Sequence, residues 1–286
     1  MTDTIEPTHS EVVEAGKRKR QPARGLKFTK GNHQYRLDGN HVPGVTTILG
    51  VLDKPAIPKW AAKRVAEFVA TEPDAIDQLR NLGERSMVNA LKEIPWQQRD
   101  DAGKRGTTIH DYAEALLNGE EVEVDDELVP VVENALRFMD DWHIEPILVE
   151  AAVGSREHRY AGTLDLIAQY RRPDTGARGV AIFDWKSGKA LYPEYAWQLA
   201  AYAFAEFHGL NGDEKALPEC DASFGVQVRA DGYDVAPFAF GPDVFDEFLA
   251  IRHTYDVAKR GRGNWKVPGS GHVGLMIQTN TEGTAA

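Results

Sequence analysis

The sequence has one cysteine, Cys220, among its 286 residues. A single cysteine excludes a disulfide within the chain, and also a four-cysteine iron–sulfur site built by the chain alone. Long apolar runs are missing too. None approaches the roughly 18 residues that a membrane helix needs, and none follows the N-terminal charges as in a secretory signal. We therefore expect a cytoplasmic protein with no membrane partner.

Acidic residues outnumber basic ones. The net charge of −11 opposes simple nucleic-acid binding, because Lys and Arg supply most of the nonspecific affinity for phosphate. The acid is concentrated, however, above all in residues 119–127. Basic residues gather elsewhere: in residues 17–20, Lys27 with Lys30, Lys59 with Lys63 and Arg64, Lys104 with Arg105, and from Lys259 to Lys266. A local basic groove is therefore compatible with the acidic total.

Two apolar, strand-like runs near the middle of the chain each carry an aspartate. Asp165 lies within LDLI, and Asp184 directly follows VAIF. Side chains two apart on a strand share a face, so Lys186 projects with Asp184, while Trp185 points to the opposite side. Burying an unpaired carboxylate is costly. We therefore predict that two acids and a lysine converge at one edge of a sheet.

Such a group suits phosphate chemistry. Hard cations such as Mg²⁺ take carboxylates, water and substrate phosphate as ligands, and they neutralise charge that develops during phosphoryl transfer. We predict Asp165, Asp184 and the backbone carbonyl of Trp185 as metal ligands. Lys186 would orient the attacking water or stabilise the transition-state oxyanion. A role as general base stays open, because neighbouring carboxylates raise the pKa of a lysine whereas a metal and desolvation lower it.

Two further side chains are candidate ligands. His110 shares a helix face with Ala113 and Leu117, so its imidazole should point inward. It is either a satisfied core residue or a group that binds a metal or phosphate through a neutral nitrogen. Glu150 lies in a predicted strand over residues 147–160. A buried salt-bridge acid and an accessory metal ligand are both consistent with its apolar neighbours.

The helix predicted after the second apolar run carries Gln198 and Tyr202 one turn apart on the same face. Most of their neighbours are apolar, which indicates burial on most sides. An inward Gln and Tyr need hydrogen-bond partners. Those partners lie either within the core or at the predicted acidic site.

Four short motifs occur in order: RGTTIH (105–110), GTLD (162–165), DWK (184–186) and QLAAY (198–202). Together they resemble the RecB-type branch of the PD-(D/E)xK nuclease superfamily, which is related to CRISPR-associated and phage recombination exonucleases. The resemblance implies a restriction-endonuclease-like central mixed sheet flanked by helices, with dependence on Mg²⁺ or Mn²⁺. It also implies a set of catalytic residues: His110, Asp165, Asp184, Lys186, Gln198 and Tyr202. Several such nucleases hold an iron–sulfur cluster, but this chain lacks the cysteines, so we expect none.

We expect a metal-dependent DNA exonuclease of phage or bacterial recombination or repair. Its partners would be linear DNA ends or single strands, and a recombination or single-strand-binding protein. The sequence has no GxxxxGK[ST] phosphate loop, so strand separation would need a partner. The alternatives are a structure-specific endonuclease and an inactive nuclease-fold module for DNA binding or assembly. The predicted DNA contacts are Lys63, Arg64, Arg105, Thr107 and Lys189, with Arg105 and Thr107 at a helix N-terminus.

The order of predicted elements indicates an α/β (α+β) fold. We expect a disordered tail over 1–23, an N-terminal hairpin and helical region carrying His110 over 24–142, the nuclease core over 143–265, and a loose tail over 266–286. The first region begins with a hairpin from Leu26 to Leu37 and continues with helices interrupted at Pro73 and Pro95. In the core, the connection over residues 171–179 contains three arginines that we expect near substrate.

Overall fold

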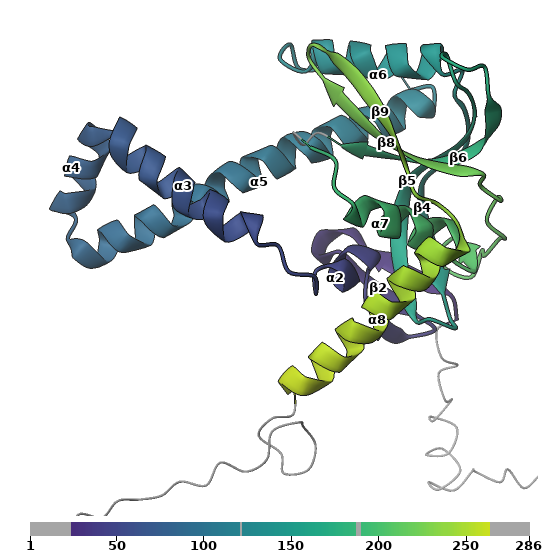
Figure 1. The fold of residues 1–286 in the computed structure, drawn as a ribbon, viewed down its shortest axis with the longest axis horizontal. Coiled ribbons are helices and arrows are strands. Elements are labelled where there is room, and N and C mark those ends of the chain that lie inside the picture. Colours follow the sequence, from purple (N-terminus) through teal and green to yellow (C-terminus); the bar gives the residue numbers. More distant parts are fainter. Residues whose placement is uncertain (1–23, 121, 187–189, 264–286) are drawn as a thin grey trace, which may run out of the picture.

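A six-stranded mixed sheet forms the centre of the molecule (Figure 1). The computed structural model describes residues 24–120, 122–186 and 190–263, with the backbone alone at 98–105, 107 and 261–263; the predicted tails over 1–23 and 266–286 lie outside it. The strand order is β7-β4-β5-β6-β8-β9, and only the β6–β8 pair is parallel among these strands. The strands are β4 (Glu145–Ser155), β5 (Tyr160–Arg171), β6 (Arg178–Lys186), β7 (Phe207–His208), β8 (Ala222–Arg229) and β9 (Gly232–Phe238). The predicted α+β class with a central mixed sheet is confirmed.

Helices cover both faces of this sheet. They are α2 (Val45–Leu49), α6 (Val129–Asp141), α7 (Glu194–Ala203) and α8 (Pro242–Gly263). Alternation along β6 sends Phe183 to the face where Phe138 of α6 packs, and sends Ile182 to the face covered by α2, α7 and α8. Phe138 and Phe183 pack edge to face at a centroid separation of 5.9 Å. The two apolar cores hold β5 and β6 rigidly between them.

The predicted hairpin from Leu26 to Leu37 is confirmed. It consists of β1 (Leu26–Thr29), a 3-10 turn η1 (Lys30–Asn32) and β2 (Gln34–Leu37), and β3 (Asn40–Val42) extends it to a three-stranded sheet. This small sheet buries Leu26 and Tyr35 against Ala152 and Ala161 of the central sheet. The N–H of Ala161 also donates to the carbonyl of Pro43 at 3.1 Å. The hairpin is therefore fixed to β4 and β5.

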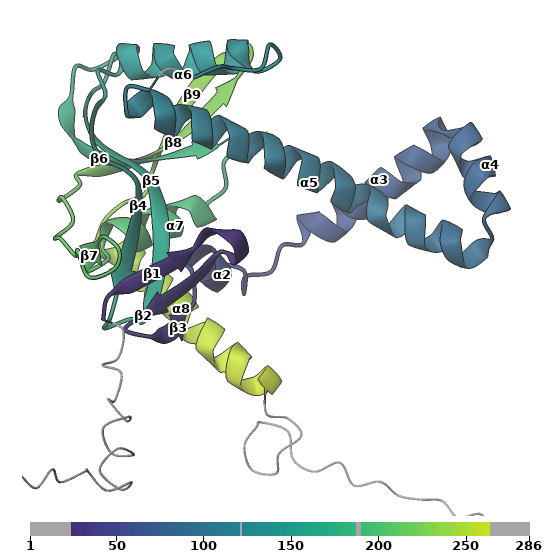
Figure 2. The ribbon, with the colours of Figure 1, turned by 180° about the vertical axis from the view of Figure 1, so that it is seen from behind.

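Three helices form an arm that extends away from the sheet (Figure 1, Figure 2). They are α3 (Ala56–Thr71), α4 (Pro73–Asn81) and the N-terminal half of α5 (Glu84–Leu117). Pro73 is the first residue of α4, a position where its missing N–H has no helical partner in any case. The predicted interruption at Pro95 is wrong, because α5 continues through it. A proline removes a single hydrogen bond, and the packing of α3 and α4 along α5 keeps the flanking turns helical.

In the described part of the chain, no helix combines the length and the apolar character that crossing a membrane requires. The arm does expose large apolar side chains. Five of them are at least 36% accessible: Ile57, Trp60, Val69, Leu82 and Val88. No residue of α3 is buried, whereas Ile76 of α4 is buried at 4% exposure.

Gly162 of β5 is buried directly beneath the ring of Tyr202, and a Cβ at this position would overlap that ring. We expect Gly162→Ala to destabilise the fold by about 1–3 kcal/mol, the usual cost of overpacking a core. Gly31→Ala is the matched control, because a Cβ there meets no atom within 4 Å. Thermal unfolding of both variants tests this expectation. Equal midpoints would show that Tyr202 moves aside without cost.

Candidate active site

A cavity of about 440 Å³ opens between the N-terminal hairpin, α5, strands β4 to β6 and α7. Residues from all of these elements line it: Phe28, Lys30, His33, Gly106, His110, Asp111, Glu114, Glu150, Thr163, Asp165, Asp184, Lys186, Gln198 and Tyr202. The six side chains predicted as catalytic are among them, together with Glu150. Segments that are far apart in the sequence thus meet around one space.

The two aspartates lie side by side on β5 and β6. Leu166 pairs with Phe183, so Asp165 and Asp184 are the next residues along the two strands. Oδ2 of Asp165 accepts the N–H of Trp185 at 2.8 Å. This bond fixes one acid against the strand that carries the other.

Asp184 is held from two sides. Only 2% of the residue is exposed. Nε2 of Gln198 donates to its Oδ1 at 3.2 Å, and Nε2 also lies 3.4 Å from the Tyr202 hydroxyl. The Lys186 ammonium forms an ion pair with Oδ2. Trp185, between these two residues, packs into the core under α6. The inward Gln198 and Tyr202 thus find their partner at the acidic site.

His110, Glu150 and Asp165 form a cluster whose potential ligand atoms all lie within 4.8 Å of one another. Nδ1 of His110 is 3.5 Å from Oδ2 of Asp165 and 3.9 Å from Oε1 of Glu150. Nε2 is 3.1 Å from the Trp185 carbonyl, the group that we predicted as a metal ligand. A proton on Nε2 donated to this carbonyl leaves Nδ1 facing the acids. In the neutral imidazole, its lone pair is then directed at the space between the carboxylates.

Glu150 adopts an unusual backbone conformation. Its φ is 45°, in the left-handed region, although it lies inside β4. Its neighbours Val149 and Ala151 pair with Leu166 and Leu164, which places it across from Asp165. Such a conformation costs on the order of 1–3 kcal/mol and is found mainly where a site requires it. Within the described residues no lysine or arginine forms a salt bridge with Glu150, which favours the metal-ligand alternative.

The charges in the cavity shift one another's protonation. Burial alone would lower the pKa of His110, but Glu150, Asp165 and Asp184 outweigh it and raise the pKa to about 9. Burial, and then the charge of Asp184, hold the pKa of Asp165 well above its usual range. The cluster therefore retains protons at neutral pH when no cation is bound.

Lys186 stays charged. Burial would lower its pKa, yet Asp184 and Asp165 outweigh burial and raise the pKa above the ordinary lysine value. Its ammonium also lies 4.5 Å from the centre of the Tyr195 ring, a cation–π contact. A lysine held in this way is a poor general base and a good point charge, so the geometry favours the positioning role.

The donor set fits a hard divalent cation. Carboxylate oxygens from Glu150 and Asp165 and one imidazole nitrogen from His110 converge, and Glu150 contributes its carboxylate from a left-handed backbone conformation. Oxygen-rich sites of this kind suit Mg²⁺ or Mn²⁺. Asp184 faces the same cavity, but its contacts are with Gln198 and Lys186.

The predicted DNA contacts lie elsewhere or outside the described side chains. Lys63 and Arg64 are on α3 in the arm, and both pair with Glu67. The expectation that Arg105 and Thr107 begin a helix is wrong, because α5 starts at Glu84. The backbone N–H groups near residue 105 lie in the helix interior, where they bond to helix carbonyls and are not free to bind phosphate. Their side chains lie outside the described residues, and so does all of Lys189.

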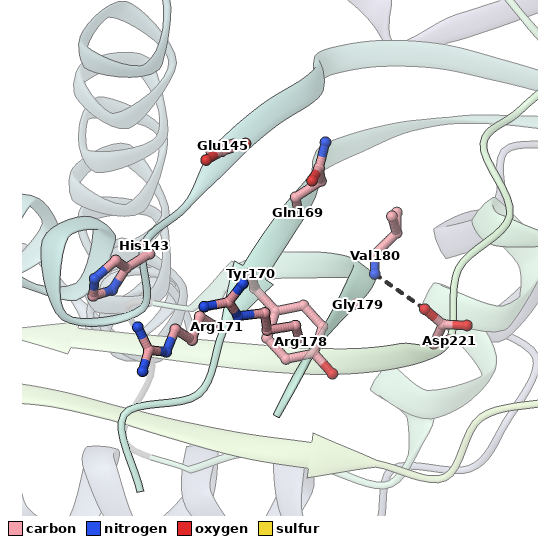
Figure 3. A pocket seen from close by; sticks show the side chains of 9 residues that line it. All are labelled: His143, Glu145, Gln169, Tyr170, Arg171, Arg178, Gly179, Val180 and Asp221. Atoms are coloured by element: carbon pink, nitrogen blue, oxygen red, sulfur yellow. Dashed lines mark hydrogen bonds between the residues drawn. The ribbon is translucent and has the colours of Figure 1, made fainter. Parts of the chain in front are cut away.

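The arginine-rich connection lies at a separate cavity of about 460 Å³ (Figure 3). Arg171 and Arg178 line it, six residues along their strands from the acids, or roughly 20 Å at the usual rise of a strand. Arg172 pairs instead with Asp174 at 2.6 Å. Of the residues that the structure describes around the acidic cavity, none belongs to this connection.

Sequence reasoning missed several residues of the site. Tyr195 could have been found, because it precedes Gln198 by three residues and Tyr202 by seven and so shares their helix face. Phe28, Lys30 and His33 carry no such signal. Their hairpin is attached by a contact between Tyr35 and Thr163, which are 128 residues apart, and periodicity does not report such contacts.

Replacement of Glu150 separates strain from ligand chemistry. Glu150→Gly and Glu150→Ala both remove the carboxylate, but only glycine tolerates a φ of 45° without strain. We expect the glycine variant to be more stable than the alanine variant by about 1 kcal/mol, the reverse of their usual order in a strand. Both variants should lose most of the stabilisation that Mn²⁺ gives the parent. Thermal unfolding with and without Mn²⁺ measures both effects, and full Mn²⁺ stabilisation in either variant would remove Glu150 from the ligand set.

Metal affinity should rise with pH. A cation displaces the proton on His110, whose pKa is about 9 in the metal-free protein, so the affinity increases about tenfold per pH unit for each displaced proton below that pH. The contribution of His110 to the stability of the metal-free protein has the opposite trend. A raised histidine pKa stabilises the fold below the unfolded-state value of about 6.5, and this contribution is lost as the pH rises through 9. Calorimetric Mn²⁺ titrations at pH 6.5 and 8.5 test the affinity, and a flat profile would contradict proton displacement.

Compared with models of protein families and with curated proteins, the chain matches none of them.

Proposed function

We propose that the protein is a metal-dependent DNA exonuclease of the RecB-type, PD-(D/E)xK kind, which hydrolyses phosphodiester bonds. One observation carries the proposal. Asp165, Asp184 and Lys186, which the motifs predict to converge, line one cavity together with His110. A cavity with paired acids, a charged lysine and an inward histidine suits the hydrolysis of a phosphate ester.

His110, Glu150 and Asp165 are the residues that would hold the cation, through one nitrogen and two carboxylates. When bound, Mg²⁺ or Mn²⁺ supplies Lewis-acid stabilisation of the charge that develops on the phosphate. The contact from Nε2 of His110 to the Trp185 carbonyl at 3.1 Å orients the ring and leaves Nδ1 for the ligand set.

Lys186 places a fixed positive charge beside Asp184, where it orients the attacking water or stabilises the oxyanion. Gln198 holds Asp184 in position through a 3.2 Å hydrogen bond. Tyr202 remains protonated, because burial raises its pKa well above the ordinary value, and its hydroxyl lies next to Gln198. These residues fix the acid and the lysine before substrate arrives.

We also propose where the enzyme acts. Linear ends and single strands of DNA arise during recombination and repair, so the proposed location is the cytoplasm of a bacterial or phage-infected cell. A recombination or single-strand-binding protein would present the strand. Two alternatives are a structure-specific endonuclease and an inactive nuclease-fold module for DNA binding or assembly. Digestion of linear and circular DNA distinguishes them from an exonuclease.

End-labelled linear DNA should lose its label with Mg²⁺ or Mn²⁺ and remain intact with a chelator. We expect Lys186→Ala and Asp184→Asn to reduce the rate by about 10²–10⁴-fold, the range found when a positioned charge or proton-transfer group is removed. Covalently closed circular DNA should resist digestion, because an exonuclease needs an end. Rapid cleavage of the circle would instead favour the endonuclease.

Lys215→Ala provides a matched control. Asp213 and Lys215 have the same spacing as Asp184 and Lys186, but their side chains are 81% and 64% exposed. This variant should retain the parent's rate. Equal rates in parent, Lys186→Ala and Asp184→Asn proteins would overturn the proposed function, since the activity would then come from another site or a contaminant.

A further inference from the structure

The N-terminal hairpin forms an aromatic wall of the acidic cavity. Phe28 and His33 both line the cavity, and their rings meet edge to face at 5.2 Å with an interplanar angle of 87°. On the hairpin, Phe28 also stacks on Tyr35 at 4.8 Å and 21°. Tyr35 is buried, whereas Phe28 is only half-buried and His33 is exposed. The wall therefore has a buried aromatic base and an accessible aromatic surface.

This wall is fixed to the strand that carries Asp165. The Tyr35 hydroxyl and Thr163 Oγ1 are 2.9 Å apart in a hydrogen bond. Thr163 is two residues before Asp165 on β5, so the two side chains share a face at a separation of roughly 7 Å along the strand. The position of the rings relative to the acids is therefore built into the fold.

The turn that closes the hairpin adds a cation. Lys30 lines the cavity and is exposed, and within the described residues it makes no salt bridge. His33, at the end of the turn, has a φ of 52°, a left-handed conformation that few residues other than glycine adopt. Two accessible rings and an ammonium thus face the same space as the candidate metal cluster, and the charge of that ammonium also acts on Glu114.

We propose that Phe28, Lys30 and His33, the hairpin platform, bind an unpaired nucleotide next to the reacting phosphate. The inference rests on the proposed function, because it assigns how that site holds its substrate. A base would stack on Phe28, opposite Tyr35, with its edge toward the perpendicular His33 ring, and the phosphate beside it would contact Lys30. Bases inside a duplex are covered by their neighbours, so the platform accepts a nucleotide only at an unpaired end.

The test measures binding in the presence of Mn²⁺, in full-length protein that carries Lys186→Ala to prevent cleavage. The probes are oligodeoxynucleotides with 2-aminopurine at the end, either single-stranded or in a blunt duplex. Stacking should quench the fluorescence of the single-stranded probe. Adding Phe28→Leu, which keeps apolar volume but removes the ring, should abolish the quenching and weaken single-strand binding by about 5- to 150-fold, with duplex binding unchanged. Lys30→Ala should lower the slope of log affinity against log salt by about 1.

Phe240→Leu is the matched control. Phe240 is also half-buried and packs on another aromatic ring, Phe204, at 5.5 Å, but it does not line the cavity. It should leave quenching and affinity unchanged, while thermal unfolding shows whether either leucine variant alters the fold. Unchanged quenching and affinity in a folded Phe28→Leu protein would overturn the platform, even if metal-dependent cleavage persists. If the parent neither binds nor cleaves DNA, the proposed function fails as well.

Discussion

The main constraint on this structure is the free-energy cost of placing two carboxylates side by side in the interior of a domain. Asp165 and Asp184 lie on adjacent strands, and Asp184 is almost fully buried. Like charges in a space of low polarity repel, and each loses hydration. Three groups stabilise these carboxylates. The Lys186 ammonium and the Gln198 amide contact Asp184, and the N–H of Trp185 donates to Asp165. A protonated His110 completes the compensation when no cation is present.

These compensating groups come from elements that the two apolar cores hold in place. β6 sends Trp185 into the core under α6 while Asp184 and Lys186 face the cavity, so one strand supplies both packing and chemistry. Gly162 allows Tyr202 to lie directly on β5, which brings α7 and its Gln198 within reach of Asp184. Glu150 and Gly162 are alike in one respect: at each position an unusual backbone feature lets a functional side chain reach the site. At Glu150 it is the left-handed conformation, and at Gly162 it is the missing Cβ.

Local patterns in the sequence predicted what depends on local geometry. The alternation along residues 180–186 predicted that Asp184 and Lys186 project from the same face of the strand. Helical spacing predicted that Gln198 and Tyr202 share one face of their helix. The same reasoning failed at Pro95, where packing by α3 and α4 outweighs the loss of one hydrogen bond. It named Glu150 as a candidate ligand but could not find Phe28 or the left-handed conformation of Glu150, because both depend on contacts between distant segments and not on residue type or period.

The acidity of the cavity sets the order in which ligands enter it. Five carboxylates line the cavity: Asp111, Glu114, Glu150, Asp165 and Asp184. The basic residues that line the cavity are fewer: Lys30, Lys186 and two histidines. A phosphodiester that approaches the metal-free site therefore meets an excess of negative charge. A divalent cation held by His110, Glu150 and Asp165 would put positive charge beside the approaching phosphate, and it would release the protons that the cluster retains. In the proposed nuclease, cation binding therefore precedes productive binding of DNA.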